Sequence, residues 1–264
     1  MSDRPAPGPL TGTTVVVTRT RSQASSLVDR LTAEGATVVE LPVIAIEDPP
    51  DGGEALDLAA NRAAEGAYDW LVFTSTNAAS RFLAALDGRP VPRFTRWAAV
   101  GPGTALTLSR GGYPPDLVPA ISVAEALADE LPAPSSGTGG GPAGRVLFPR
   151  AESVRGVLAT GLRAKGWVID EVVAYRTVAG SPDPGAVAAA SRADAVAFAS
   201  SSTVERTVEL LGIDQVPPVV ASIGPITSAS VVSAGLSVTV EAGEHTIDGL
   251  VAALLSAGIT SGER

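Results

Sequence analysis

The chain has 264 residues, more than the ~100 to 200 of one typical domain, so two lobes with separate cores are expected. It is 45% hydrophobic and 18% charged, a composition typical of a globular protein with buried parallel strands. A net charge of -9 argues against nucleic acid or an anionic membrane as partner, and the absence of cysteine excludes disulfides and thiolate chemistry. No signal-peptide core or membrane-spanning apolar run is found, so a soluble, cytoplasmic protein is expected.

Short apolar runs followed by helix-period segments recur along the chain, a pattern typical of strand-to-helix units. The first half contains TTVVVTR before SQASSLVDRLTAEG, DWLVFTS before TNAASRFLAAL, RWAAVGPGTALTLSRGG and DLVPAISVAEALADEL. The second half contains RVLFPRAESVRGVLATGLRAKG, DAVAFASSSTVERTVELLG, PVVASIGPITSASVVSAG and SVTVEAGEHTIDGLVAALL. This alternation predicts α/β lobes with parallel sheets that helices cover on both faces.

The second half repeats landmarks of the first. Arg19 and Arg150 are 131 positions apart, Asp69 and Asp194 are 125 apart, and the turns GPGTA and GPITS begin 123 apart. Any α/β protein repeats strand, turn and helix, but the matched turns and arginines favour a duplication.

Two extended segments occupy equivalent places in the halves. LPVIAIEDP begins at Leu41 and VVAYRTVAG at Val172, again 131 positions apart, and both are candidate connectors between lobes. Residues 1–9, 133–144 and 259–264 are predicted to be flexible because they are terminal or rich in Gly, Ser and Pro.

Several common chemistries lack their motifs. The Gly-rich GGGPAG at 139–144 precedes a predicted strand, whereas a dinucleotide fingerprint lies between strand and helix, and no GxxxxGK[ST] run exists. His245 is the only histidine, which excludes a histidine-cluster metal site and leaves a triad only if this residue is the base. It precedes Thr246, a predicted helix N-cap, so a surface position is expected for His245.

The turns after the strands are uniformly polar. TRTRS, FTSTN, VGPGT, FPRAES, FASSST, IGPIT and EHT each place hydroxyls or arginine where a helix begins. Helix starts expose backbone N–H groups, and each contact with an anion there is stabilising by ~0.3 to 1 kcal/mol. Ligands of parallel sheets bind beyond the carboxyl ends of the strands. Ordinary N-capping explains any single turn, but the collective pattern predicts a site for a polyanion.

The ordered set VVVTR, VFTSTNAA, AVGPGTA, LFPRAES, AYRTV, FASSSTV, SIGPITS and HTIDGLV resembles the uroporphyrinogen-III synthase family over essentially the whole chain. The resemblance implies two flavodoxin-like or Rossmann-like parallel-sheet domains with exchanged units. Residues 10–42 plus 178–260 would form one domain and 46–172 the other, joined by a two-stranded β linker that acts as a hinge. The sequence repeat alone fits two tandem halves equally well.

The same resemblance implies an enzyme, a lyase of tetrapyrrole (heme, siroheme or cobalamin) biosynthesis. It would cyclise hydroxymethylbilane, with loss of water and inversion of ring D, to uroporphyrinogen III. No cofactor and no metal are expected, because the cationic intermediate forms in the substrate itself. A monomer that has hydroxymethylbilane as substrate and contacts hydroxymethylbilane synthase transiently is expected.

Tyr175 in AYRTV matches the cleft tyrosine of the family and is the candidate catalytic residue. A phenol is protonated at neutral pH and can donate to the departing hydroxyl, although packing in a hinge strand would also suit an aromatic residue. By motif position, the expected substrate-binding residues are Arg19, Thr74, Ser75, Thr76, Arg150, Ser200, Ser201, Ser202 and Thr227.

Two other classes of protein fit parts of the pattern. A noncatalytic two-lobed intracellular sensor of anions or tetrapyrroles would bind a ligand without turnover. A flavodoxin-type flavin carrier could hold the phosphate of its cofactor at FTSTN or FASSST.

Overall fold

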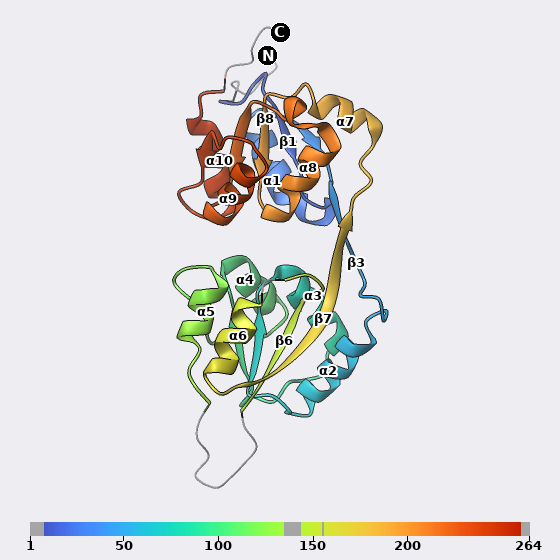
Figure 1. The fold of residues 1–264 in the computed structure, drawn as a ribbon, viewed down its shortest axis with the longest axis vertical. Helices are drawn as coiled ribbons and strands as arrows, with labels where there is room; N and C mark the ends of the chain where they lie inside the picture. The colour runs from blue at the N-terminus through green and yellow to red at the C-terminus, as the bar shows by residue number, and fades with distance from the viewer. Residues whose placement is uncertain (1–7, 135–143, 155, 260–264) are drawn as a thin grey trace, which may run out of the picture. The chain divides into compact units, whose positions relative to one another are not determined.

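The computed structural model divides into two compact α/β units (Figure 1). Unit 1 combines the residues up to Ala45 with those from Val178 onward, and unit 2 is Ile46–Thr177. The chain leaves unit 1 within β3 (Ile44–Glu47) and returns within β7 (Val168–Ala179), which are neighbours in one sheet. The structure describes residues 8–134, 144–154 and 156–259.

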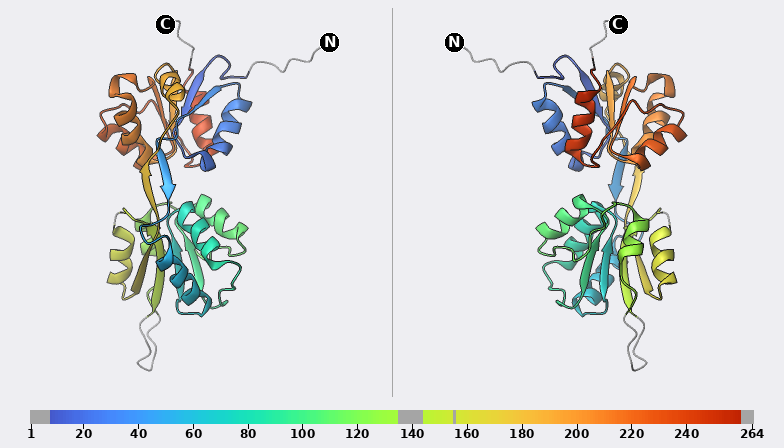
Figure 2. Two further views of the ribbon diagram at one scale, coloured as in Figure 1. Left: turned by 90° about the vertical axis from the view of Figure 1, so that its right-hand side faces the viewer. Right: turned by 90° about the vertical axis from the view of Figure 1, so that its left-hand side faces the viewer.

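Unit 1 is a parallel sheet in the order β10-β9-β8-β1-β2. Its strands are β1 (Thr14–Val17), β2 (Thr37–Glu40), β8 (Ala195–Phe198), β9 (Val219–Ser222) and β10 (Val240–Glu241). One face is covered by α1 (Arg21–Ala33) and α10 (Ile247–Ser256), the other by α7 (Pro184–Ala190), α8 (Val204–Leu211) and α9 (Pro225–Ser233) (Figure 2). Val15 and Val17 point to the first face and Val16 to the second, as the two-residue period of a strand requires.

Unit 2 contains a sheet in the order β3-β7-β6-β4-β5, in which the run from β7 to β5 is parallel. Its other strands are β4 (Trp70–Phe73), β5 (Arg96–Ala99) and β6 (Arg145–Ala151). One face is covered by α2 (Glu54–Ala64), α3 (Thr76–Leu86) and α4 (Pro102–Arg110), the other by α5 (Ala124–Glu130) and α6 (Val157–Ala164). The predicted α/β class with mostly parallel sheets is confirmed.

Both sheets have the same strand order once the repeat is applied. β1, β2, β8 and β9 correspond to β6, β7, β4 and β5, and the place of β10 is taken by a single parallel bridge between Ala98 and Leu117. The apolar run that opens the predicted unit DLVPAISVAEALADEL therefore contributes a single bridge at Leu117. Chain direction around the sheet reverses between β1 and β8 in unit 1 and between β6 and β4 in unit 2.

The repeated aspartates join the strands at these reversals. Asp194 Oδ2 accepts a hydrogen bond of 2.7 Å from the amide of Thr14 at the start of β1. Asp69 Oδ2 accepts the equivalent bond, 2.8 Å long, from the amide of Arg145 at the start of β6. The sequence repeat therefore preserves a contact that sets the register of the two central strands.

Some residues predicted to be flexible are part of the fold. Gly8 begins a turn in which its carbonyl accepts from Thr11 N, and a Cβ at Gly8 would lie 2.3 Å from the carbonyl oxygen of Glu34. Trp167 Nε1 donates to Pro132 O at 2.9 Å next to Ala133 and Pro134. The rest of that prediction, residues 1–7, 135–143 and 260–264, lies outside the described residues.

Tyr68 is a buried polar group near the amino end of β4. Its hydroxyl donates to Asp170 Oδ2 at 2.5 Å, and Arg62 Nη1 approaches the same oxygen at 3.4 Å. Burial, reinforced by the hydrogen bond to the carboxylate, raises the pKa of Tyr68 to about 12. The native state therefore holds this proton more tightly than the unfolded chain does.

This difference predicts an alkaline loss of stability that depends on Tyr68. The contribution is complete below about pH 10 and is lost as pH rises through about 12. Urea unfolding of the wild type and of Tyr68→Phe at several pH values should give curves of stability against pH that converge in this window. Parallel curves would contradict the assignment.

Candidate functional site

The residues predicted to bind substrate, except Thr227, follow or end the strands at the two reversals of strand order. In open parallel sheets this is where adjacent crossovers diverge and leave a crevice at the carboxyl ends of the strands. Arg19 follows β1 and Ser200 follows β8, whereas Thr74 follows β4 and Arg150 is the penultimate residue of β6. We call these places the unit 1 switch point and the unit 2 switch point.

At the unit 1 switch point, hydroxyl groups connect the two strands. Thr18 Oγ1 donates to Thr203 Oγ1 at 3.0 Å, and Thr203 Oγ1 donates to Ser200 O at 2.8 Å. Both threonines are almost completely buried. Ser200 Oγ and Ser202 Oγ are 2.9 Å apart. Ser200 precedes the 3-10 turn Ser201–Thr203, and α8 follows that turn directly. The structure therefore brings these three predicted serines together in one turn.

Arg19 is a half-buried cation at the same switch point. Within the described part of the chain, no carboxylate forms an ion pair with its guanidinium. Burial lowers the pKa of Arg19 below its usual range, because desolvation disfavours the charged form. An anionic ligand at this position would supply the missing counter-charge.

The start of α9 holds a carboxylate that the sequence analysis missed. Thr227, predicted to bind substrate, is buried in the first turn of this helix. Beside it, Ser222 Oγ lies 2.5 Å from Ser228 Oγ, and Ser228 Oγ donates to Glu241 at the end of β10. A carboxylate of the chain itself is thus bound by the hydroxyl of Ser228 in the first turns of α9. The signal was available as a lone acidic residue after an apolar run, SVTVE.

The start of α4 in unit 2 lacks this internal carboxylate. Thr104 is buried like its counterpart Thr227, but Ala99, Ala105 and Val118 stand 123 positions before Ser222, Ser228 and Glu241. The duplicated helix starts therefore have different polar surroundings.

At the unit 2 switch point, Ser75 caps α3. Ser75 Oγ accepts a hydrogen bond of 3.1 Å from Asn77 N, and it also lies 2.9 Å from Tyr175 Oη. Thr74 and Thr76 flank Ser75 and are half-buried. Below the cap, the rings of Phe73 and Phe82 pack with centroids 5.4 Å apart and fix α3 on β4.

A bulge in β7 determines where Tyr175 points. Arg150 pairs with Val173, but the next residue, Ala151, pairs with Tyr175, so Ala174 is the extra residue. A shift of one residue moves a side chain to the other face of a sheet. The extra residue places Tyr175, which is 8% exposed, on the face covered by α2, α3 and α4. It thereby brings the phenol to Ser75.

Arg150 differs from Arg19 although the two occupy matched positions. Its Nε donates to Glu171 Oε2 at 2.8 Å, and its Nη1 donates to the carbonyls of Ala151 and Glu152 at 2.8 and 2.9 Å. Arg150 therefore already has a carboxylate partner inside unit 2, which it shares with Arg163. Of the two arginines, Arg19 is the better candidate for contact with a ligand carboxylate.

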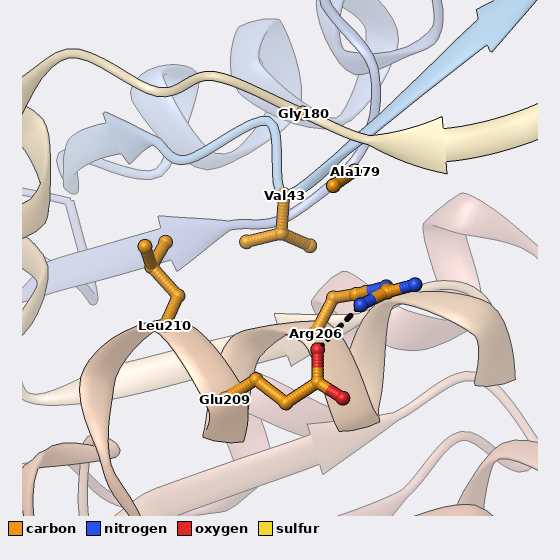
Figure 3. Close-up of a pocket in the computed structure, with 6 residues that line it drawn as sticks. All are labelled: Val43, Ala179, Gly180, Arg206, Glu209 and Leu210. Carbon is orange, nitrogen blue, oxygen red and sulfur yellow. Dashed lines mark hydrogen bonds and ion pairs between the residues drawn. The ribbon is translucent and has the colours of Figure 1, made fainter.

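Cavities also lie away from the switch-point turns. The one in Figure 3 has a volume of 170 Å³ and lies in unit 1, where Val43, Ala179 and Gly180 face the α8 side chains Arg206, Glu209 and Leu210. Arg206 and Glu209, three positions apart on α8, form an ion pair of 2.6 Å along this wall of the cavity. None of these residues is a predicted site residue.

The second cavity, 470 Å³ in volume, lies in unit 2 beside β3. Arg176 pairs there with Glu47 at 2.8 Å, and Arg81 pairs with Asp48. Arg176 Nε is a buried donor without a hydrogen-bond partner in the stretches that the structure describes. The two ion pairs balance the charge of this cavity, so we do not assign it to an anion.

The predicted surroundings of His245 are confirmed. His245 is exposed, and Thr246 Oγ1 caps α10 by accepting from Gly249 N at 3.0 Å. The imidazole lies over Gly224, where an added Cβ would be 2.8 Å from its Cδ2.

Across the described ranges, no helix is long and apolar enough to span a bilayer.

These features define a class of protein: an α/β protein of two duplicated units, with polar residues at the switch point of each sheet. The profile of uroporphyrinogen-III synthase HemD matches residues 25–252. The uroporphyrinogen-III synthase of Synechococcus elongatus is 34% identical over 265 residues, which cover 93% of this chain and 96% of the relative. The chain therefore belongs to the uroporphyrinogen-III synthase family.

Solved structures show the same fold at lower identity. A mutant uroporphyrinogen III synthase of the extremely thermophilic bacterium Thermus thermophilus superposes with a TM-score of 0.63 at 18% identity, covering 93% of this chain and 98% of that one. The uroporphyrinogen-III synthetase of Helicobacter pylori gives a TM-score of 0.58 at 16% identity, with 92% and 99% covered. The predicted family membership is confirmed, and the sensor alternative is not favoured.

The contrast between the two arginines predicts opposite effects on stability. Arg150→Gln should lower the free energy of unfolding by about 1 to 2 kcal/mol, because it leaves Glu171 with one cation fewer. Arg19→Gln should change it by no more than about 0.5 kcal/mol, or raise it, because a desolvated charge is removed. Urea unfolding at neutral pH measures both. A larger loss for Arg19→Gln would mean that its charge has a structural partner.

Proposed function

We propose that this chain converts hydroxymethylbilane into uroporphyrinogen III, with inversion of ring D and release of water. The observation that carries the proposal is the match to a uroporphyrinogen-III synthase along 93% of the chain. The hydroxyl-rich turns that lead into helices at both switch points support it. The substrate carries several acetate and propionate groups, and hydroxyls and helix starts bind such carboxylates. The enzyme needs no cofactor in this proposal.

The substrate carboxylates would be held by Arg19, by hydroxyls and by backbone amides. Arg19 lacks an internal counter-ion among the described residues, and Ser200, Ser201 and Ser202 follow β8, the strand that pairs with β1. The way Ser228 holds Glu241 supports carboxylate binding by hydroxyls at helix starts in this fold. Thr227 is buried in the first turn of α9, next to that contact. We propose that it contributes to carboxylate binding through this position.

At the unit 2 switch point, Tyr175 would assist departure of the hydroxyl. The C–O bond of the hydroxymethyl group breaks, its electron pair leaves with the oxygen, and the phenol proton converts the leaving group to water. The resulting azafulvene cation is attacked as the macrocycle closes, and the proton released on closure restores the phenol. Thr74 and Thr76 flank the cap and are proposed to contact substrate carboxylates. Arg150 would not contact the substrate directly but would act through Glu171, the carboxylate with which it pairs.

The bilane also closes without an enzyme to the uninverted isomer, so control of substrate conformation is the main task. Rapid transfer from hydroxymethylbilane synthase by transient contact would limit that side reaction. We propose that the protein acts as a monomer in the cytoplasm.

The proposal predicts which isomer the protein makes. Purified protein supplied with hydroxymethylbilane freshly made by its synthase should give mostly type III uroporphyrin after oxidation, resolved chromatographically from type I. Binding of the bilane with type I at the background level would instead support the sensor.

Tyr175→Phe should lower kcat by about 10²-fold, because general acid assistance is lost while the ring still packs. Circular dichroism should show an unchanged fold. Tyr113→Phe is the matched control: its hydroxyl contacts only the backbone around Arg89 and Val91 in the described structure, and it should keep wild-type turnover. Unchanged turnover in Tyr175→Phe would remove this residue from the mechanism.

A further inference from the structure

The hydroxyl of Ser75 has more contacts than a helix cap needs. It accepts the amide hydrogen of Asn77 at 3.1 Å and is also 2.9 Å from Tyr175 Oη. A serine hydroxyl has one proton to donate and two lone pairs to accept with. Because the cap uses one lone pair, the contact with Tyr175 involves either the serine proton or the phenol proton.

The two directions of this hydrogen bond have different chemical consequences. If the phenol donates to Ser75, its proton is occupied and unavailable to a leaving group. If Ser75 donates to Tyr175 Oη, the phenol proton is free to point at another acceptor. A hydroxyl donor also stabilises the negative charge that develops on the phenol oxygen as its proton moves away.

Comparison of the repeats shows that this contact goes beyond ordinary capping. Ser200 stands 125 positions after Ser75 at the unit 1 switch point, where its hydroxyl contacts Ser202 and caps no helix. The position 131 before Tyr175 is Ile44, which has no polar group. The duplication thus keeps the serine in both units, while the phenol occurs only in unit 2.

The surroundings of Tyr175 hold the pair in place. Its backbone carbonyl accepts from Glu152 N at 2.9 Å, and the bulge at Ala174 fixes the face to which its ring points. Tyr175 as a whole residue is only 8% exposed, which limits the access of water to its side chain.

From this geometry we infer that Ser75 is a positioning residue for Tyr175, whose hydroxyl donates to Tyr175 Oη and leaves the phenol proton directed at the leaving hydroxyl. This changes the role predicted for Ser75 from substrate contact to orientation of the proton donor. The inference rests on the proposed function.

A double-mutant cycle tests the inference. Ser75→Ala should lower kcat by about tenfold and leave KM within about twofold, because the lost hydrogen bond acts only when the proton is transferred. In the Tyr175→Phe background, Ser75→Ala should have almost no further effect on kcat. Equal losses in both backgrounds, or a rise in KM alone, would overturn the inference and return Ser75 to direct substrate binding.

Further variants separate the cap from the contact with Tyr175. Ser75→Thr keeps both acceptor and donor and should restore most of kcat. Ser75→Asp keeps an acceptor for the Asn77 amide but has no proton to donate at neutral pH, so it should fold and still show the loss of kcat. Ser80→Ala removes an exposed hydroxyl from the same helix and should match the wild type. A Ser75→Asp enzyme with wild-type kcat would overturn the inference.

A measurement without turnover distinguishes failure of this inference from failure of the proposed function. With 13Cζ-labelled tyrosine, the Tyr175 signal is identified by its absence from Tyr175→Phe. Its chemical shift should move in Ser75→Ala and stay in place in Ser80→Ala. An unmoved signal would overturn the hydrogen bond even if type III product forms, whereas absence of type III product in the wild type would overturn the function alone.

Discussion

The pairing of two central strands in each sheet is the constraint on which the polar sites depend. β1 pairs with β8, and β6 pairs with β4, although the partners come from distant parts of the sequence. Asp194 and Asp69 fix the registers by accepting the first amide of the neighbouring strand. Since both strands of a pair run in the same direction, their polar turns emerge together. A one-residue slip would exchange the buried and exposed faces and separate those turns.

The two duplicated units share their strand order but carry different chemical groups at their switch points. The unit 1 switch point contains a cation, Arg19, without an internal partner among the described residues, and the nearby start of α9 already binds Glu241. At the unit 2 switch point the matched cation, Arg150, pairs with Glu171, and a phenol is present. This difference suits a reaction in which binding of carboxylates and departure of a hydroxyl are separate tasks for separate residues.

Periodicity and turn residues predicted the α/β class, because short apolar runs such as Val15–Val17, followed by helix-period segments, can be recognised in the sequence alone. They also predicted the Thr246 cap, which depends on local contacts alone. They could not predict that Ala174 is an extra residue in β7, because a bulge is defined by the partner strand. For the same reason, the pairing of Arg150 with Glu171 and the partner of Tyr175 required the structure.

The course of the chain through the two units has a consequence for biosynthesis. Unit 2 is one continuous segment, Ile46–Thr177, whereas unit 1 needs both ends of the polypeptide. On the ribosome, β1 and β2 are made before unit 2, but β8, which pairs with β1, is made only after all of unit 2. Unit 2 can therefore fold while translation continues, and the amino-terminal strands must wait with one edge unpaired. The order of elements thus allows the central unit to fold before unit 1 is complete.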